Sequence, residues 1–151
     1  MSTPPTPDDD AVVDLGLLPG LIGYALRRAQ VAVLQDFHRS MAEHDIRPAQ
    51  FSVLEVIKHN PGLRQTLASF ALGIKTTNFV PLLDELERRG LVGRRPIAGD
   101  RRAKGLFLTP RGSDLTARLE QLAGEHEARL VARIGAEDKA RLVALLRQLS
   151  D

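Results

Sequence analysis

Basic side chains are concentrated in one short segment of the sequence, residues 88–111. This segment holds eight lysine and arginine residues and one acidic residue, Asp100, and therefore carries a net charge of +7. The rest of the chain, with 13 basic and 18 acidic residues, carries −5, although the whole protein has a net charge of only +2. Guanidinium and ammonium groups gathered in this way neutralise phosphates, so the segment predicts a site that binds a polyanion.

The alternative reading of this segment is a solvated loop with surplus arginine. Apolar residues interrupt the basic run, however, and residues 105–109 alternate, with Leu106 and Leu108 on one face and Phe107 on the other. We therefore predict a hairpin with strands over 91–95 and 105–109 and a turn over 96–104.

A second group of polar side chains, at residues 75–78, begins a predicted helix that ends at Arg89. Short polar side chains in a first helical turn can reach base edges in a major groove, and the helix N-terminus favours a phosphate oxygen. The hairpin tip can place a guanidinium in the adjacent minor groove. The alternative is that the two threonines only cap the helix. The predicted DNA-binding residues are Lys75, Thr76, Thr77, Asn78, Arg94, Arg95, Asp100, Arg101, Arg102 and Lys104.

Amphipathic helices flank these two groups, because apolar residues recur at spacings of three and four. The short helix over 65–72 is expected to turn Leu67, Ala68 and Ala71 inward. Two short helices followed by a basic hairpin form the order of a winged helix-turn-helix, so we predict a mostly α fold with a small β-hairpin wing. The expected helices run from after Pro19 to near Asp45, from Pro48 to Asn60, over 65–72, from Thr76–Asn78 to Arg89, from Pro110 to Gly135, and through the leucines of 142–149.

Length and composition exclude several other classes. The 151 residues suit one domain, and 43% hydrophobic residues can form a core. The absence of cysteine excludes disulfides and Cys-ligated zinc, and the four histidines lack ligand spacing, so no metal or cofactor is expected. No catalytic motif is present, which argues against an enzyme. No apolar run approaches the ~20 residues of a membrane span, so we expect a cytoplasmic protein with no membrane partner.

From about Leu17 to Leu149 the sequence resembles the MarR family of transcription regulators. Three segments carry the resemblance, and Asp100 and Arg102 of the third fall on the family's wing motif. The segments are 46–51 (IRPAQF), 82–92 (LLDELERRGLV) and 100–112 (DRRAKGLFLTPRG).

The resemblance implies an obligate-type homodimer that represses transcription and releases its operator when a small molecule binds. The first segment, 1–14, is expected to be a disordered arm because it is rich in proline and aspartate, and the resemblance divides the rest of the chain into dimerisation helices (15–45 and 110–151) and a DNA-binding lobe (46–109). The dimer would bind double-stranded DNA at a pseudo-palindromic operator. The rival class is a winged helix for protein interaction or DNA architecture without ligand control, which the +7 segment disfavours.

One residue departs from the family pattern. Pro81 stands where many members carry an arginine that touches DNA. Proline donates no hydrogen bond and is tolerated in the first helical turn, so the helix is expected either to start late or to kink.

The effector expectation also rests on resemblance. Residues 72–83 (LGIKTTNFVPLL) are similar to regulators of aromatic-acid catabolism, including those that answer to hydroxycinnamoyl-CoA thioesters. An aromatic acid or its CoA thioester is therefore the expected effector. The predicted lining is Phe37, His38, Met41, Phe51 and Leu54, with Arg27, Arg28 and Arg39 as cations for CoA phosphates.

The predicted dimer contacts are Leu15, Leu17, Leu18, Leu142, Leu145, Leu146 and Leu149.

Overall fold

The computed structural model describes residues 13–150, so residues 1–12 of the predicted N-terminal arm lie outside the described residues. The chain divides into two compact units, with the boundary between Val33 and Leu34 inside helix α1 (Ile22–Met41). The first unit contains a short 3₁₀ helix, η1 (Leu18–Gly20), and the N-terminal part of α1.

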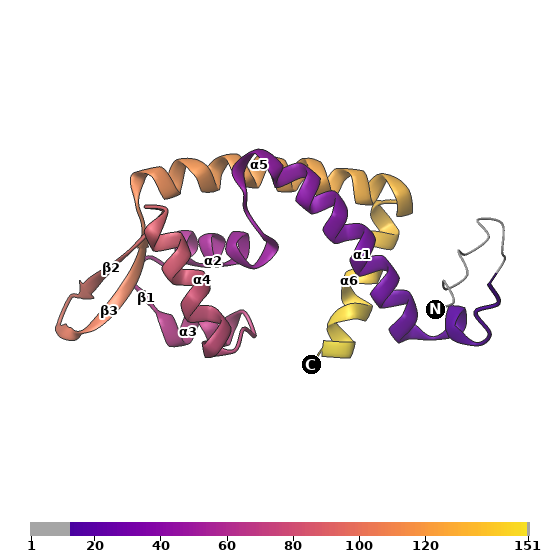
Figure 1. Ribbon diagram of the computed structural model, residues 1–151, viewed down its shortest axis with the longest axis horizontal. Coiled ribbons are helices and arrows are strands. Elements are labelled where there is room, and N and C mark those ends of the chain that lie inside the picture. Colours follow the sequence, from indigo (N-terminus) through magenta and orange to yellow (C-terminus); the bar gives the residue numbers. More distant parts are fainter. Residues whose placement is uncertain (1–12, 151) are drawn as a thin grey trace, which may run out of the picture. The chain divides into compact units, whose positions relative to one another are not determined.

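The second unit contains the predicted DNA-binding elements in the predicted order (Figure 1). This arrangement confirms a mostly α fold with a winged helix-turn-helix. After the end of α1 come η2 (Ala42–His44), α2 (Pro48–His59), β1 (Leu63–Arg64), α3 (Gln65–Ala71), α4 (Thr76–Arg88), β2 (Val92–Ile97), β3 (Asp100–Leu108), α5 (Pro110–Ile134) and α6 (Ala136–Ser150).

The hairpin is longer than predicted. Strands β2 and β3 pair antiparallel from Val92 opposite Leu108 to Pro96 opposite Lys104, with an irregularity before Ile97, and the turn shrinks to residues 98–99. The expected turn over 96–104 was wrong because basic side chains on both solvated faces hide the alternation that marks a strand. Gly99 makes the tight turn possible with a φ of +86°.

A third strand, β1, completes the sheet in the order β1-β3-β2 and was not predicted. A strand of two residues is too short to show the alternation of apolar and polar side chains by which a strand is recognised in the sequence. The pairing places Arg64 opposite Gly105, where a Cβ would lie 2.6 Å from the carbonyl oxygen of Gly62. Gly105 is therefore the residue that lets β1 approach the wing.

Helix α3 packs less of its surface than predicted. Ala68 is buried as expected, but Leu67 is 55% exposed and Ala71 is also exposed, so those two expectations were wrong. Ser69 is buried instead, because its hydroxyl donates to the carbonyl of Ile74 at 2.7 Å. Burying a hydroxyl costs little free energy when it has a backbone hydrogen-bond partner.

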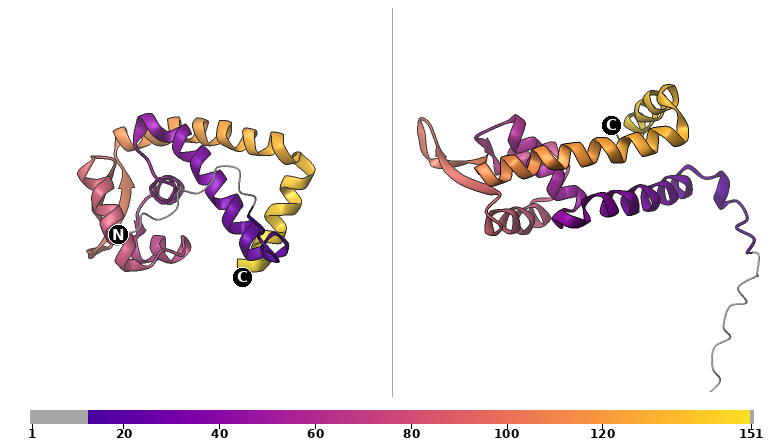
Figure 2. Two further views of the ribbon diagram at one scale, coloured as in Figure 1. Left: turned by 45° about the vertical axis from the view of Figure 1, so that its right-hand side comes forward. Right: turned by 90° about the horizontal axis from the view of Figure 1, so that it is seen from above.

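Helix α5 begins in direct contact with the end of the helix-turn-helix and leads from the hairpin to α6 (Figures 1 and 2). As predicted, Thr109 caps the helix, accepting from the amide of Gly112 at 2.9 Å. The same hydroxyl donates to the carbonyl of Gly90 at 2.6 Å, and the Thr109 amide donates to Leu91. These bonds join the wing, the end of α4 and α5.

Candidate nucleic-acid interface

Helix α4 is held on the domain by three apolar side chains on one face. Phe79, Leu83 and Leu86 are fully buried. Burial of that face turns the opposite side of the first turn outward, where Lys75, Thr76, Thr77 and Asn78 are all exposed. The structure therefore brings together the four polar residues that the sequence analysis assigned to the major groove.

The turn before α4 is fixed by backbone and side-chain bonds. Gly73 adopts a φ of +62°, and the amide of Ile74 donates to the carbonyl of Ser69 at 3.0 Å, while the Ser69 hydroxyl returns a bond to the Ile74 carbonyl. Lys75 is the N-cap residue and has no side-chain capping bond. The amide of Asn78 donates to the Lys75 carbonyl at 2.9 Å, so Thr76 and Thr77 provide the first-turn amides that can donate to a phosphate oxygen.

Pro81 lies inside α4 rather than in its first turn, because the helix begins at Thr76. The expected late start was therefore wrong, and the helix continues past Pro81 to Arg88, while the kink stays a prediction. Proline supplies no N–H for the carbonyl of Thr77, four residues earlier. Pro81 is exposed, and its ring offers DNA only an apolar contact.

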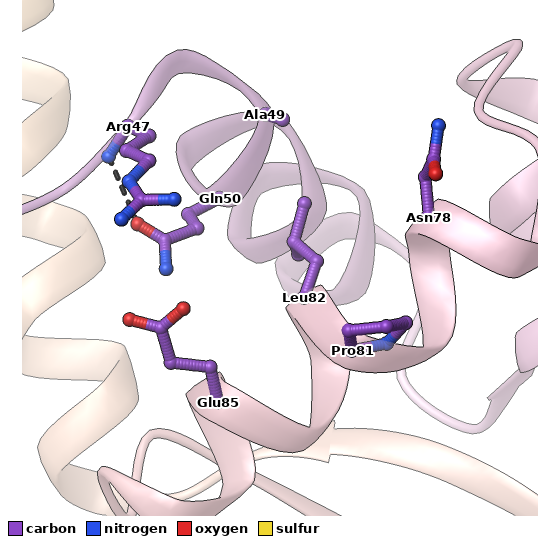
Figure 3. Close-up of a pocket in the computed structure, with 7 residues that line it drawn as sticks. All are labelled: Arg47, Ala49, Gln50, Asn78, Pro81, Leu82 and Glu85. Carbon is purple, nitrogen blue, oxygen red and sulfur yellow. Dashed lines mark hydrogen bonds between the residues drawn. The ribbon is translucent and has the colours of Figure 1, made fainter.

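A pocket of about 290 Å³ opens beside α4, between it and the start of α2 (Figure 3). The Glu85 carboxylate points toward Gln50 and Arg47, whose amide donates to the Gln50 side chain at 2.9 Å. This pocket contains none of the residues predicted to bind the effector. It is lined by Arg47, Ala49, Gln50, Asn78, Pro81, Leu82 and Glu85.

The wing presents several of its basic side chains at the surface. Arg95 lies over the ring of Phe107, with 4.0 Å between the guanidinium carbon and the ring centroid. This cation–π contact limits the conformations of Arg95 while leaving it exposed. Arg102 and Lys104 are also exposed. The side chains of Asp100 and Arg101, at the hairpin tip, lie outside the described residues.

Arg94 differs from the other wing arginines because it points toward α4. Its guanidinium pairs with Asp84 at 2.7 Å and with Glu87, and its side chain is only 25% exposed. Two carboxylates neutralise the charge that the sequence analysis assigned to DNA. The pairing joins strand β2 to helix α4.

This pairing leads to a prediction with an unusual sign. Asp84→Asn combined with Glu87→Gln removes two negative charges from α4, so electrostatics alone predicts tighter DNA binding. We expect the opposite result: the double variant should bind DNA more weakly, by about 1 kcal/mol or roughly fivefold, because it loses the contact that positions the wing. Binding is measured by fluorescence anisotropy with a labelled operator duplex.

Two single variants provide the control for this prediction. Arg94→Ala removes the paired wing charge, and Lys104→Ala removes an exposed one. Lys104→Ala should lower the salt dependence of binding by about one counterion, whereas Arg94→Ala should lower affinity without that change. A double variant of Asp84 and Glu87 that binds DNA more tightly than the parent would show that Arg94 does not position the wing.

The predicted effector residues fall into three environments. Phe37, Met41 and Leu54 are buried, with Met41 and Leu54 at 0% exposure, and Phe51 is half-buried. His38 and Arg39 are exposed, as are Arg27 and Arg28 of the first unit. The structure brings the rings of Phe37 and Phe51 together, with centroids 6.1 Å apart.

Sequence analysis missed a partly buried polar cluster next to these rings. His126 of α5 is 7% exposed, and its Nδ1 lies 2.6 Å from the Oδ2 of Asp36 in α1. Arg129 contacts the same carboxylate at 2.9 Å. Hydrogen bonds from Arg129 and His126 hold the pKa of Asp36 well below its usual range. The spacing of Arg129 one helical turn after His126 is visible in the sequence, but their partner lies 90 residues away.

The leucines predicted for the dimer are exposed in both units. Leu15, Leu17 and Leu18 are 40–71% exposed, and Leu142, Leu145, Leu146 and Leu149 of α6 are 37–60% exposed. Two turns of α6 line a shallow groove with Ile134. Leucines in such numbers at a surface indicate a contact with another protein surface.

Among residues 13–150, every helix is too short or too polar to span a bilayer. The same residues contain no group of three or more histidine, aspartate or glutamate side chains placed to hold a metal ion.

Comparison with known proteins identifies relatives over nearly the whole chain. The MarR family pattern matches residues 44–103. A transcriptional regulatory protein for the hcr operon of Thauera aromatica is 32% identical over 146 residues, which cover 96% of this chain and 88% of the relative.

Solved structures of a transcriptional repressor, CouR, are also similar. CouR bound to a 23-mer DNA duplex is 41% identical and superposes with a TM-score of 0.87, covering 93% of this chain and 100% of that one. CouR bound to p-coumaroyl-CoA is 40% identical with a TM-score of 0.85, covering 92% and 98%.

Proposed function

Because the chain belongs to the MarR family of transcription regulators, we propose that it is a repressor that binds operator DNA and leaves it when an aromatic effector binds. The observation that carries the proposal is the exposed row Lys75–Asn78 beside a wing with a surplus of basic residues, on a chain 41% identical to a repressor that binds DNA. This function involves no chemical step. Its expected site of action is the cytoplasm.

The DNA contacts divide between two elements. Thr76, Thr77 and Asn78 are placed for base edges, and Lys75 for the backbone. Arg95, Arg102 and Lys104 of the wing add phosphate and minor-groove contacts. Asp100 and Arg101 are proposed at the tip of the wing, where Asp100, like Arg102, falls on the family's wing motif.

For the effector, we propose a hydroxycinnamoyl-CoA thioester. The support is that CouR, 40% identical over 92% of this chain, binds p-coumaroyl-CoA. Phe37 and Phe51 supply aromatic wall for the acyl group, and Arg27, Arg28 and Arg39 are the proposed cations for the CoA phosphates. Of the remaining proposed residues, His38 is exposed at the surface, and Met41 and Leu54 are buried and support the rings of Phe37 and Phe51.

The effector acts only through a difference in affinity between the free and the DNA-bound protein. Such coupling is typically 1–3 kcal/mol, or about 5- to 150-fold in affinity. A thioester can favour a dimer whose recognition helices no longer match the groove spacing, and its phosphates can also repel DNA.

The experiment is an operator titration by anisotropy with p-coumaroyl-CoA and free p-coumarate in parallel. The operator duplex comes from the DNA next to the protein's own gene. Release by the thioester alone supports the proposal, and release by the free acid alone replaces it with an aromatic-acid sensor. If the protein binds DNA and neither compound changes that binding, ligand control is rejected and an architectural role takes its place.

We also propose a homodimer built from residues 15–45 and 110–151, flanking the DNA-binding lobe of 46–109. The exposed leucines at both ends of the chain, including Leu17 at 71% and Leu149 at 60%, need a partner surface. An isologous pair predicts an operator with two half-sites about one DNA turn apart.

The expected result for the dimer is a mass near twice 16.6 kDa by light scattering at micromolar concentration. Leu145→Glu combined with Leu149→Glu should shift the mass toward one chain, because each charge would be buried without a partner. A parent protein that scatters as a single chain contradicts the proposed assembly.

A further inference from the structure

Asp36 has more charged and polar partners, among them His126 and Arg129, than are needed to neutralise its carboxylate. Arg129 already neutralises Asp36, with its Nη2 2.9 Å and its Nε 3.2 Å from Oδ2, and its Nη2 also contacts the Ser40 hydroxyl. Asp36 therefore has a counter-charge without His126. The 2.6 Å bond from His126 to the same carboxylate needs another explanation.

That bond fixes which ring nitrogen carries the proton. Hydrogen bonds from Arg129 and His126 lower the pKa of Asp36, so at neutral pH the carboxylate is ionised and can only accept. The Nδ1 of His126 must then be the donor. In the neutral ring, Nε2 is left as a hydrogen-bond acceptor in a defined orientation.

The imidazole that carries this acceptor lies next to the aromatic ring of Phe37. The rings of Phe37 and His126 meet edge to face, with centroids 5.7 Å apart and planes at 89°, and the ring of Phe51 lies 6.1 Å from that of Phe37. The His126 side chain is 8% exposed. Among the side chains that the structure describes, none forms a hydrogen bond with its Nε2, and Nε2 is not one of the unpaired atoms that are sealed from solvent.

We propose that His126 selects effectors with a hydroxyl group on the aromatic ring, by accepting a hydrogen bond from that hydroxyl at Nε2. Asp36 and Arg129 are positioning residues that hold the imidazole in the accepting tautomer. An aryl ring packed near Phe37 would place its hydroxyl near Nε2 of His126. The inference rests on the proposed function and names the ligand group that the site distinguishes.

The first test uses the parent protein and two ligands that differ by one oxygen. Calorimetry with p-coumaroyl-CoA and cinnamoyl-CoA should give roughly tenfold tighter binding of the hydroxylated thioester, because cinnamoyl-CoA would cover Nε2 without a partner. Equal affinities would overturn the inference and leave the proposed function intact. Binding of neither thioester would instead reject the proposed function.

The second test removes the acceptor. His126→Phe keeps an aromatic ring against Phe37 and should reduce the preference for the hydroxylated thioester to about twofold or less, mainly by weakening p-coumaroyl-CoA binding. His59→Phe, at an exposed histidine at the end of α2, is the matched control and should keep the parent's preference. An unchanged preference in a folded His126→Phe protein would contradict the assignment.

A spectroscopic readout does not depend on the variant folding. Long-range ¹H–¹⁵N spectra of the parent should show His126 protonated at Nδ1, and the unprotonated Nε2 signal should shift with p-coumaroyl-CoA much more than with cinnamoyl-CoA. Proton attachment at Nε2 in the neutral ring, or equal shifts with both ligands, would overturn the proposal.

Discussion

Arg102→Ala is expected to weaken operator binding by about 1–3 kcal/mol, or roughly 5- to 150-fold. Arg102 is exposed on β3, next to the tip of the wing, and falls on the family's wing motif. A guanidinium at the tip of a wing adds charge-assisted hydrogen bonds in the narrow minor groove, where the DNA potential is most negative. Alanine removes both the charge and the reach of this side chain.

The control for Arg102→Ala is Arg118→Ala, which makes the same chemical change on an exposed position of α5. The control should bind operator within about twofold of the parent, because Arg118 lies on α5 and is not one of the proposed DNA contacts. Thermal melting establishes that both variants are folded. If Arg102→Ala binds as tightly as Arg118→Ala, the wing does not contact DNA as proposed.

Gly112→Ala is expected to destabilise the fold by more than about 4 kcal/mol. A Cβ at this position would lie 1.9 Å from the backbone carbonyl oxygen of Leu91, far inside contact distance. Neither group is the end of a flexible side chain. The start of α5 must move away from Leu91, which also breaks the Thr109 bonds that join α5 to the end of α4.

Gly124 of the same helix provides the comparison for Gly112. A Cβ at Gly124 meets nothing within 4 Å, so Gly124→Ala should stabilise the protein by about 0.5–1 kcal/mol through helix propensity. Urea denaturation of both variants measures the difference. A Gly112→Ala protein as stable as the parent would show that α5 does not pack on Leu91 in solution.

Most helices of this protein could be predicted from the sequence because their signals are local. Thr109 followed by Pro110 marked the start of α5, and Gly135 marked its end. The family resemblance was confirmed by the comparisons. Local signals failed where burial is decided by distant contacts: Leu67 of α3 is exposed although its spacing predicts burial.

The site shows the same division between local and distant information. The polar row at residues 75–78 was found because it begins a helix, and composition alone revealed the basic wing. The direction of Arg94 was missed because its partners, Asp84 and Glu87, look like ordinary solvated helix charges in the sequence. The pairing of Asp36 with His126 depends on how α1 and α5 pack, which no spacing encodes.

The central claim is that α4 and the wing bind the phosphate backbone of DNA, and the salt dependence of operator binding tests it most directly. If six or more phosphates are neutralised, affinity should fall about a thousandfold or more between ~50 and ~200 mM salt, linearly in a plot of log affinity against log salt. An affinity for operator that stays constant over this range would contradict the proposed interface.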